Sequence, residues 1–508
     1  MGQNGALVET KSGKLQGIYE DGLFVFKGIP YAAPPTGNLR WMPPRPVKPW
    51  VGTRSAEKFG PICPQDTRPT PMPGRKPSEE PQSEDCLFVN VWTPAADNGK
   101  RAVMVWIHGG AFMNGSGSTP NNPGKTLPLR GGIVLVTLNY RLGTLGFLHL
   151  KQITGGRITS TGNEGFLDQI AALHWVHDNI AVFGGDPENV TVFGESSGAE
   201  SLGALLAMPQ SKGLFQKAIL QSGASKSQPL DRAVMVAERV VGKLGLTGKD
   251  VDALMAIPPQ ALITAPRELA ASGTPGVSAG NLGPVLDGEV LKEVPLDAFE
   301  RGSAKDITVL AGSNLEEGKL FALMAGRDIE KMNEADMVKR VQRLMLEQYA
   351  AGLIEKYRSA LAKRDLPVTP YEIYAAIQGD QHFRMPNIRL CQFQEKLGKP
   401  SYGYVFTWKS AAPGFGACHA LDVGFVFGNL NEEFHGCGPG AQKLAENMQD
   451  AWLAFAKTGD PSSPGLGKWP RYGKDRKMMV LGADSHVEAA PYEEERAAWD
   501  GIPNNILG

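Results

Sequence analysis

The sequence lacks an excess of charge of either sign. Its 508 residues include 52 lysines and arginines and 53 aspartates and glutamates, which gives a formal net charge of −1 at pH 7. Proteins that bind nucleic acid carry a clear positive surplus, so this balance argues against a nucleic-acid partner. Long apolar runs are also missing, since no stretch reaches the roughly 20 apolar residues of a membrane-spanning helix. We therefore expect no membrane partner.

Cysteine is scarce as well. The five cysteines form no Cys-x-x-Cys pair, and five in a chain this long do not make a disulfide framework. The first residues, MGQNGALVETKSGK, show no charged segment followed by an apolar one, which is the pattern of a secretory leader. Together these features predict a cytoplasmic location with reduced thiols.

Motifs for metals and nucleotide cofactors are absent too. His174 and His177 are separated by two residues, but the spacing is not that of His-Glu-x-x-His and no third ligand is evident. No Gly-x-Gly-x-x-Gly joins a strand to a helix with an acidic residue beyond it, as a dinucleotide site requires. We predict neither a metal nor a cofactor.

Glycine and proline, in contrast, are abundant, with 61 and 38 residues. Their richest stretch runs from Pro61 to Pro81 and is too long and too polar for a buried connection. Loops of this kind lie at the surface and often border functional sites. The composition therefore predicts a surface loop or active-site rim over residues 61–85.

The rest of the chain alternates short apolar runs with helical patterns. A helical pattern from Leu167 to Val176 can cover one broad helix face. Strands that alternate with helices predict the α/β class, with a mostly parallel sheet covered on both faces. No linker divides the chain, so we expect one domain over residues 1–508 with a large helical insertion at residues 320–384. The runs that predict buried strands are Val103–Ile107, Ile133–Leu138, Val190–Phe193, Ala218–Leu220, Ile307–Leu310 and Tyr402–Phe406.

Two segments match the Gly-x-Ser-x-Gly pattern of a nucleophilic serine, and they are centred on Ser196 and Ser278. In the α/β-hydrolase fold this serine sits on a sharp turn between a strand and a helix, with glycines on either side. A run rich in β-branched residues precedes Ser196, and a helical pattern follows it. Ser278 has loop sequence on both sides. The context therefore favours Ser196 as the nucleophile.

Backbone donors for a negatively charged oxygen are expected in His108–Phe112, with the sequence HGGAF. Acyl transfer places negative charge on a carbonyl oxygen, and preorganised N–H groups stabilise it. This segment follows an apolar strand ending at Ile107, as the His-Gly-Gly-Gly motif does in lipases and esterases. The pattern predicts an oxyanion hole next to Ser196.

The general base must follow both the serine and the acid in the chain. Four histidines come after Ser196, and of these His419 lies in a loop after the late strand at residues 402–406. His382 and His435 lie in polar stretches that look irregular, and His486 lies beyond the last predicted sheet strand. We therefore predict His419 as the base.

The acid should end an earlier strand, and the run Ile307–Leu310 leads to Glu316 and Glu317. Chemistry alone leaves the choice between these two open: one would hold the imidazole N–H and orient the ring, and the other would face solvent. Asp287 is an alternative, but a Leu-Asp-Gly sequence is typical of a turn.

Several segments resemble signatures of the type-B carboxylesterase and cholinesterase family, most closely those of its bacterial members. The resemblance covers nearly the whole chain, from residues 28–32 to residues 469–470. The matching segments are SEDCL at 83–87, FGESSGA at 193–199, GSNLEEG at 312–318, CHALDVGFVFG at 418–428 and WLAFAKTGDP at 452–461.

The resemblance implies an α/β-hydrolase fold and the hydrolysis of carboxylic esters. It also implies that the acid is Glu317, because the glutamate directly before glycine is catalytic in the family. The N–H groups of Gly110, Ala111 and Ser197 would form the oxyanion hole. Ser197 stands where relatives usually have alanine, and Ala111 replaces the third glycine of many relatives; neither departure affects the triad.

Structural pairs are implied by the same resemblance. Arg40 would pair with Glu84, and Arg141 with Asp168, both as structural ion pairs. The two cysteines at positions 63 and 86 match a pair that is disulfide-bonded in secreted relatives. Because we expect a reducing compartment, we predict free thiols at Cys63 and Cys86.

The resulting prediction is a monomeric serine carboxylesterase that acts on a small-molecule ester through an acyl-enzyme intermediate. Four phenylalanines next to site residues in sequence are candidates to line its pocket: Phe112, Phe321, Phe415 and Phe425. An amidase or carbamate hydrolase with the same triad is an alternative. A non-catalytic binding protein of the same fold is another, and the intact triad argues against it.

Overall fold

The computed structural model describes residues 6–67, 73–74, 79–120, 122, 124–274 and 282–507. The described residues fall into two compact units. The first is drawn from Met1–Pro69, Pro77–Ala218 and Ser227–Glu293, and the second from Thr70–Lys76, Ile219–Lys226 and Val294–Gly508. Strand β10 (Lys217–Gln221) contains residues of both units.

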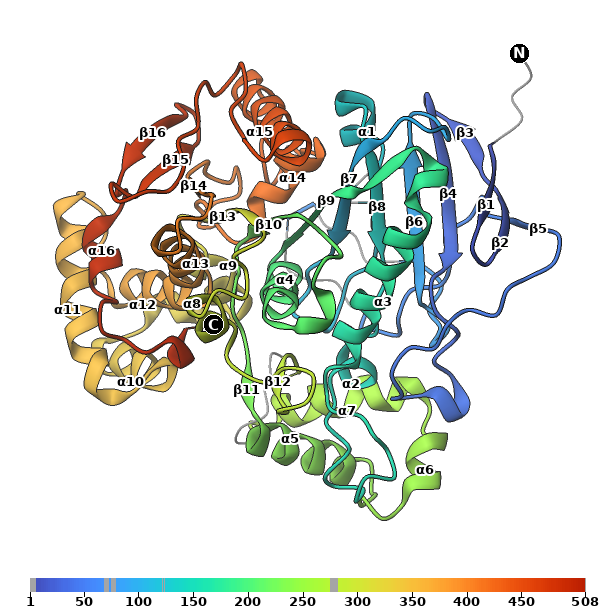
Figure 1. The fold of residues 1–508 in the computed structure, drawn as a ribbon. Coiled ribbons are helices and arrows are strands. Elements are labelled where there is room, and N and C mark those ends of the chain that lie inside the picture. Colours follow the sequence, from blue (N-terminus) through green and yellow to red (C-terminus); the bar gives the residue numbers. More distant parts are fainter. Residues whose placement is uncertain are drawn as a thin grey trace. The chain divides into compact units, whose positions relative to one another are not determined.

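The first unit is built on a mixed sheet (Figure 1). Its central strand β7 runs parallel to β8 on one side and to β9 on the other. Strands β6, β4 and β3 continue beyond β8, each antiparallel to its neighbour. The strands of this unit are β1 (Leu7–Thr10), β2 (Gly13–Gln16), β3 (Ile18–Glu20), β4 (Leu23–Pro30), β5 (Thr53–Ser55), β6 (Phe88–Thr93), β7 (Arg101–Ile107), β8 (Val134–Leu138), β9 (Gly185–Glu195), β11 (Gln228–Pro229) and β12 (Val285–Leu286).

Strands β7 and β8 are apolar along their length because helices and loops bury them on both faces. Every residue of β8, and every residue of β7 after the first, is buried. Helix α4 packs against β9 and β7, and α3 packs against β9 and α4. The helices of this unit are α1 (Thr126–Gly131), α2 (Gly143–Gly146), α3 (Glu164–Asn179), α4 (Ser197–Ala207), α5 (Leu230–Lys243), α6 (Val251–Ala256) and α7 (Pro259–Ala271).

In the second unit, β13, β14 and β15 are parallel to one another and β16 is antiparallel to β15. Its strands are β13 (Thr308–Asn314), β14 (Ser401–Phe406), β15 (Lys477–Leu481) and β16 (His486–Ala489). Its helices are α8 (Pro295–Glu300), α9 (Gly318–Met324), α10 (Glu334–Leu344), α11 (Glu347–Lys363), α12 (Pro370–Gly379), the π-helix η5 (Asp380–Arg384), α13 (Met385–Lys396), α14 (Leu421–Phe427), α15 (Pro439–Thr458) and α16 (Glu493–Ala497).

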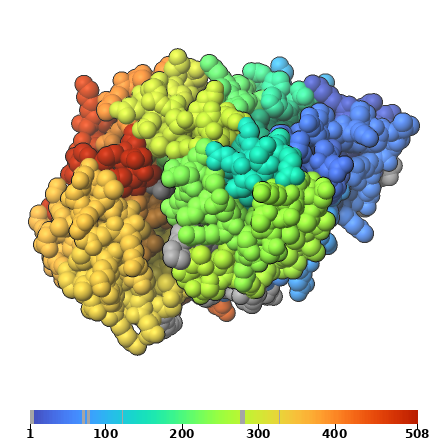
Figure 2. Space-filling view, turned by 90° about the horizontal axis from the view of Figure 1, so that it is seen from below, coloured from blue at the N-terminus to red at the C-terminus, as the bar shows by residue number. Residues whose placement is uncertain are grey.

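Helix α13 of the second unit packs against β13 and β14, and α12 contacts α9, α10 and α11. All regular elements between Leu320 and Arg384 are helical. Helices α10 and α11 form part of the surface of this unit, and α5 to α7 form part of the surface of the first (amber and light green in Figure 2). Within the described ranges, no helix has both the length and the apolar character that spanning a membrane requires.

The last strands correct one expectation about the histidines. His486 begins β16, so the prediction that it lies beyond the last sheet strand is wrong. All four residues of β16 are exposed, and among the described strands it pairs with β15 alone. Such an edge strand has no buried face, so it leaves no apolar pattern in the sequence.

The loop predicted at residues 61–85 lies only partly at the surface. Ile62 and Cys63 are buried, and Ile62 pairs with Gln82. The side-chain amide of Gln65 donates to the carbonyl of Gly115 at 2.9 Å and accepts that residue's N–H at 2.7 Å. These contacts hold the start of the loop against the body of the unit. Residues 68–72 and 75–78 lie outside the described residues.

Two buried ion pairs of the first unit confirm the pairs that the family resemblance implies. Arg141, just after β8, binds both carboxylate oxygens of Asp168 on α3, each at 2.7 Å. Their side chains are 3% and 0% exposed. Arg40 binds Glu84 in the same two-point manner, at 2.7 and 2.5 Å. A guanidinium and a carboxylate with this geometry satisfy each other's charge away from water.

Removing one partner of the Arg141–Asp168 pair should strongly destabilise the fold. In Asp168→Asn the guanidinium stays buried without its counter-charge, which typically costs about 3–5 kcal/mol of unfolding free energy. Urea unfolding followed by circular dichroism measures the change. The matched control is Asp178→Asn on the same helix, whose exposed pair with Lys11 contributes under about 1 kcal/mol. Equal changes in unfolding free energy for the two substitutions would contradict the structural role of the Arg141–Asp168 pair.

Candidate active site

Ser196 lies at the turn between β9 and α4, with φ of 55° and ψ of −126°. Non-glycine residues seldom adopt a positive φ, and strain of this kind is typical of the nucleophile turn of α/β-hydrolases. The two flanking glycines are needed for space. A Cβ on Gly194 would lie 2.7 Å from the carbonyl carbon of Gly198, and a Cβ on Gly198 would collide with the carbonyl oxygen of Ile107. The rival serine, Ser278, lies outside the described residues.

The glycine-rich loop after β7 approaches the same turn. A Cβ on Gly109 would lie 2.7 Å from the carbonyl oxygen of Glu195 and 3.2 Å from the Cβ of Ser196. Positive φ values of 114° at Gly110 and 56° at Ala111 bend the loop. No oxygen of a described residue accepts a hydrogen bond from the N–H of either of these two residues. Both donors therefore remain available to a ligand.

Ser197 is the first residue of α4, where helical N–H groups have no acceptor within the helix. Its carbonyl accepts a 2.7 Å hydrogen bond from the hydroxyl of Ser201, which in turn accepts one from Gln169 on α3 at 3.0 Å. Next to the loop, the hydroxyl of Tyr140 donates to the carbonyl of His108 at 2.9 Å. These buried contacts fix the backbone on both sides of the predicted oxyanion hole.

In the second unit, Glu317 and His419 form a buried pair. The Oε2 atom of Glu317 lies 2.6 Å from Nδ1 of His419, and its Oε1 accepts the N–H of Asn314 at 2.7 Å. Glu317 directly precedes α9, and His419 lies in the loop before α14. A carboxylate in this position fixes the ring's tautomer and stabilises the imidazolium when it forms. Of the two adjacent glutamates, Glu317 is the one that pairs with the histidine.

The expectation that the other glutamate faces solvent is wrong. The Glu316 side chain is only 23% exposed, and its carboxylate binds Lys319 and the backbone of Ala417. The reason is that the loop that carries His419 passes directly over the Glu316 side chain. Asn314 holds the next residue of that loop, because its side-chain amide donates to the carbonyl of Cys418 at 2.6 Å.

Buried polar contacts also support the far side of the histidine loop. Asp422, fully buried in α14, accepts hydrogen bonds from the Gln221 amide at 2.8 Å and the Tyr404 hydroxyl at 3.1 Å. Burial raises the pKa of this carboxyl above its usual value, while the hydrogen bond from Gln221 opposes the shift. These contacts give the loop a rigid base.

The four predicted pocket phenylalanines have different surroundings. Phe321 on α9 lies 4.9 Å from the His419 ring, measured between ring centroids. Phe415 is buried and packs edge-to-face against Phe434. The other two are fully buried among aromatic rings: Phe112 packs with Phe147 and Phe166, and Phe425 packs with Phe406 and Trp408.

A further aromatic residue at the histidine was missed from the sequence. Phe383 lies 4.4 Å from the His419 ring and 5.6 Å from the Phe321 ring, between centroids. It belongs to the π-helix η5, a type of turn that often occurs at functional sites. Nothing in the local sequence indicates this contact, because Phe383 and His419 are distant in the chain.

The remaining candidates for base and acid have other partners. His382 lies in η5 rather than in an irregular stretch, and burial lowers its pKa to about 4. Burial likewise lowers the pKa of His435 to about 4, and its ring accepts the Asn431 N–H. Asp287 accepts three backbone N–H groups of its own turn. In the described part of the chain, no three His, Cys, Asp or Glu side chains gather as a metal site would require.

Comparison with known proteins decides the family. The carboxylesterase family pattern matches residues 4–499 of the chain. The chain belongs to the carboxylesterase family. It is 37% identical over 497 residues to the para-nitrobenzyl esterase of Bacillus subtilis (strain 168), covering 96% of this chain and 97% of that protein. It is 35% identical over 486 residues to the fumonisin B1 esterase of Sphingopyxis macrogoltabida, covering 93% and 86%.

Solved structures agree with this assignment. A Geobacillus stearothermophilus carboxylesterase at pH 6.2 superposes with a TM-score of 0.87 at 40% identity, covering 97% of this chain and all of that one. A para-nitrobenzyl esterase structure gives a TM-score of 0.84 at 36% identity, covering 97% and 99%. The protein is therefore a carboxylic-ester hydrolase with the α/β-hydrolase fold, which confirms the expected fold class and enzyme class.

The two cysteines that match the disulfide of secreted relatives are free in this esterase. Cys63 and Cys86 are both buried thiols. A hydrogen bond with Cys63, together with burial, raises the pKa of Cys86 well above its usual value. The Cys63 sulfur also accepts the N–H of Leu142 at 3.2 Å. Both thiols are thus packed into the core.

We expect the activity to be independent of a disulfide at this position. Because the two thiols are packed in the core without a cross-link, adding dithiothreitol should leave the turnover of para-nitrophenyl butyrate unchanged. Thiol titration of the purified protein, unfolded without reductant, should find all five cysteines free. Three titratable thiols together with a loss of activity on reduction would show that a Cys63–Cys86 disulfide matters.

Proposed function

We propose that this carboxylesterase hydrolyses uncharged esters of small molecules through an acyl-enzyme formed on Ser196. In this proposal His419 is the general base, Glu317 orients its ring, and the N–H groups of Gly110, Ala111 and Ser197 bind the oxyanion. The observation that carries the proposal is the strained turn at Ser196, whose flanking glycines leave no room for a side chain, because a sharp strand-to-helix turn of this kind presents the nucleophile in α/β-hydrolases.

The reaction proceeds in two halves. In the first, His419 takes the proton of the Ser196 hydroxyl while Oγ attacks the carbonyl carbon, and the resulting oxyanion binds the backbone N–H groups. The alcohol then leaves with the proton from His419. In the second half, water attacks the acyl-enzyme by the same route, which releases the acid and restores Ser196. Glu317 stabilises the imidazolium through its contact with Nδ1.

The surroundings of these residues support a preference for uncharged substrates. Phe321 and Phe383 present aromatic rings to His419. The Gly109–Ala111 loop supplies backbone donors with at most one methyl group beside them, so bulky alcohol groups have room. Burying a charged substrate group next to such rings without a partner costs several kcal/mol.

A substrate panel tests this preference. We expect short- and medium-chain esters, including para-nitrophenyl butyrate and tert-butyl acetate, to be hydrolysed with higher kcat/KM than a charged ester or a long-chain triglyceride. A butyryl para-nitroanilide, matched to the ester in its acyl group, separates esterase from amidase activity. Fastest turnover of the triglyceride, with activation at the oil–water surface, would identify a lipase instead. A faster reaction with the anilide would identify an amidase.

A further inference from the structure

Glu316, the glutamate not used by the proposed triad, contacts the loop that carries His419. Its Oε2 accepts the N–H of Ala417 at 2.8 Å, and its own N–H donates to the carbonyl of Ala417 at 2.9 Å. Both polar backbone groups of Ala417 are therefore bonded to this one residue. Ala417 lies two residues before His419, so these bonds act close to the imidazole.

The loop is shaped to receive this carboxylate. Gly416 has a φ of 58°, in the left-handed region that favours glycine. A Cβ at this position would collide with the carboxylate of Glu316. The glycine thus lets the loop that carries His419 pass close over Glu316, and a larger residue there would displace the carboxylate.

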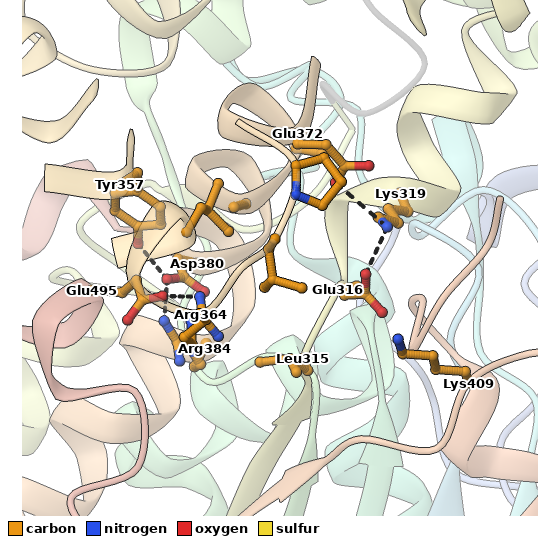
Figure 3. A pocket seen from close by; sticks show the side chains of 15 residues that line it. Leu315, Glu316, Lys319, Tyr357, Arg364, Glu372, Asp380, Arg384, Lys409 and Glu495 are labelled. Carbon is orange, nitrogen blue, oxygen red and sulfur yellow. Dashed lines mark hydrogen bonds and ion pairs between the residues drawn. The ribbon is translucent and has the colours of Figure 1, made fainter. Parts of the chain in front are cut away.

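Glu316 also belongs to a cluster of charged side chains that line a cavity of about 320 Å³. Figure 3 shows this cluster at one end of the cavity. Lys319 lies between two carboxylates, 2.6 Å from Glu316 and 3.4 Å from Glu372. Burial alone would lower the pKa of Lys319, but the two carboxylates raise it above its usual value. The ammonium therefore stays charged and holds Glu316 toward the loop from the first turn of α9.

We propose that Glu316 is a positioning residue for the esterase reaction, which sets the place of the His419 ring by holding Ala417. The inference rests on the proposed roles of Glu317 and His419. Glu317 fixes the ring only at Nδ1. The position of the ring also depends on the backbone of its loop, which Asn314 holds at Cys418 and Glu316 holds at Ala417. Without the Glu316 carboxylate the Ala417 N–H loses its acceptor and the loop is held there by the backbone bond to the Ala417 carbonyl alone, which lets the ring shift.

The size of the effect follows from the tolerance of the reaction to displacement. A shift of about 1 Å in a reacting group costs roughly 100-fold in rate. The stabilising effect on the fold, in contrast, is small, because partly exposed ion pairs contribute little to the free energy of unfolding. The proposal therefore predicts a loss of turnover without a matching loss of stability.

The experiment compares two substitutions at one position. In Glu316→Ala we expect kcat for para-nitrophenyl butyrate, per titrated active site, to fall roughly 10- to 100-fold with KM within about twofold of wild type. Glu316→Gln keeps an oxygen that can accept the Ala417 N–H, so it should restore kcat to within about fivefold of wild type. Phosphonylation by an organophosphate, which uses the same base, should slow in parallel with kcat.

The matched control is Glu372→Gln, which breaks only the longer contact with Lys319 and does not touch the loop. It should leave kcat within about twofold of wild type. Wild-type kcat in Glu316→Ala, or equal kcat in the alanine and glutamine variants, would overturn the inference. Failure of the proposed triad gives a different result, because Glu317→Gln would then keep its activity whatever the behaviour of Glu316.

Discussion

We expect the replacement of Glu317 with glutamine to lower kcat by about four orders of magnitude with little change in the fold. The carboxylate lies 2.6 Å from Nδ1 of His419 and provides both an acceptor for the ring N–H and a negative charge for the imidazolium. Glutamine has nearly the same shape, but it carries no charge and can present an NH₂ group to the ring, which then holds the wrong tautomer. Steady-state kinetics with para-nitrophenyl butyrate measures the loss, and circular dichroism verifies folding.

The neighbouring glutamate is the control for this substitution. Glu316→Gln keeps an acceptor for the Ala417 N–H and does not touch the His419 ring, so kcat should fall by no more than about fivefold. If Glu316→Gln were the severely impaired variant and Glu317→Gln nearly normal, the assignment of the acid would be reversed.

Removing the Ser196 hydroxyl has the largest expected effect, a fall in kcat of about 10⁶-fold. In the proposed mechanism no acyl-enzyme forms without Oγ, and only the backbone donors and substrate binding then accelerate hydrolysis by water. Ser196→Ala replaces one small side chain with another at the turn between β9 and α4, so the fold should be retained. Pre-steady-state measurements should show no burst of para-nitrophenol.

Ser278→Ala is the matching control, since that serine also lies in a Gly-x-Ser-x-Gly segment. It should keep the kcat and burst amplitude of the wild type. Full activity in Ser196→Ala, with loss of activity in Ser278→Ala, would move the nucleophile to the other segment.

The central strands were predictable because their sequence pattern follows from burial. Strands β7 and β8 are covered on both faces, so they form continuous apolar runs that stand out between polar turns. Strands near the start and end of the chain were not predicted. β1 alternates buried and exposed residues over only four positions, and β16 is exposed throughout. Such short patterns cannot be distinguished from loops without knowing the strand's partner.

The site shows the same division between local and long-range information. The serine turn and the glycine loop are each encoded in a few consecutive residues, because steric crowding demands glycine at fixed positions. The choice between Glu316 and Glu317 depended on family resemblance, since chemistry alone left it open. The contacts of Glu316 with Ala417 and of Phe383 with His419 join residues far apart in the chain. No local pattern encodes either one.

Covalent labelling tests most directly the claim that Ser196 is the nucleophile. The esterase is treated with phenylmethylsulfonyl fluoride until activity stops, and the modified protein is digested and mapped by mass spectrometry. The account predicts one label per chain, located on Ser196, with activity falling in proportion to the label. A label on Ser278, or complete inactivation with Ser196 unmodified, would contradict it.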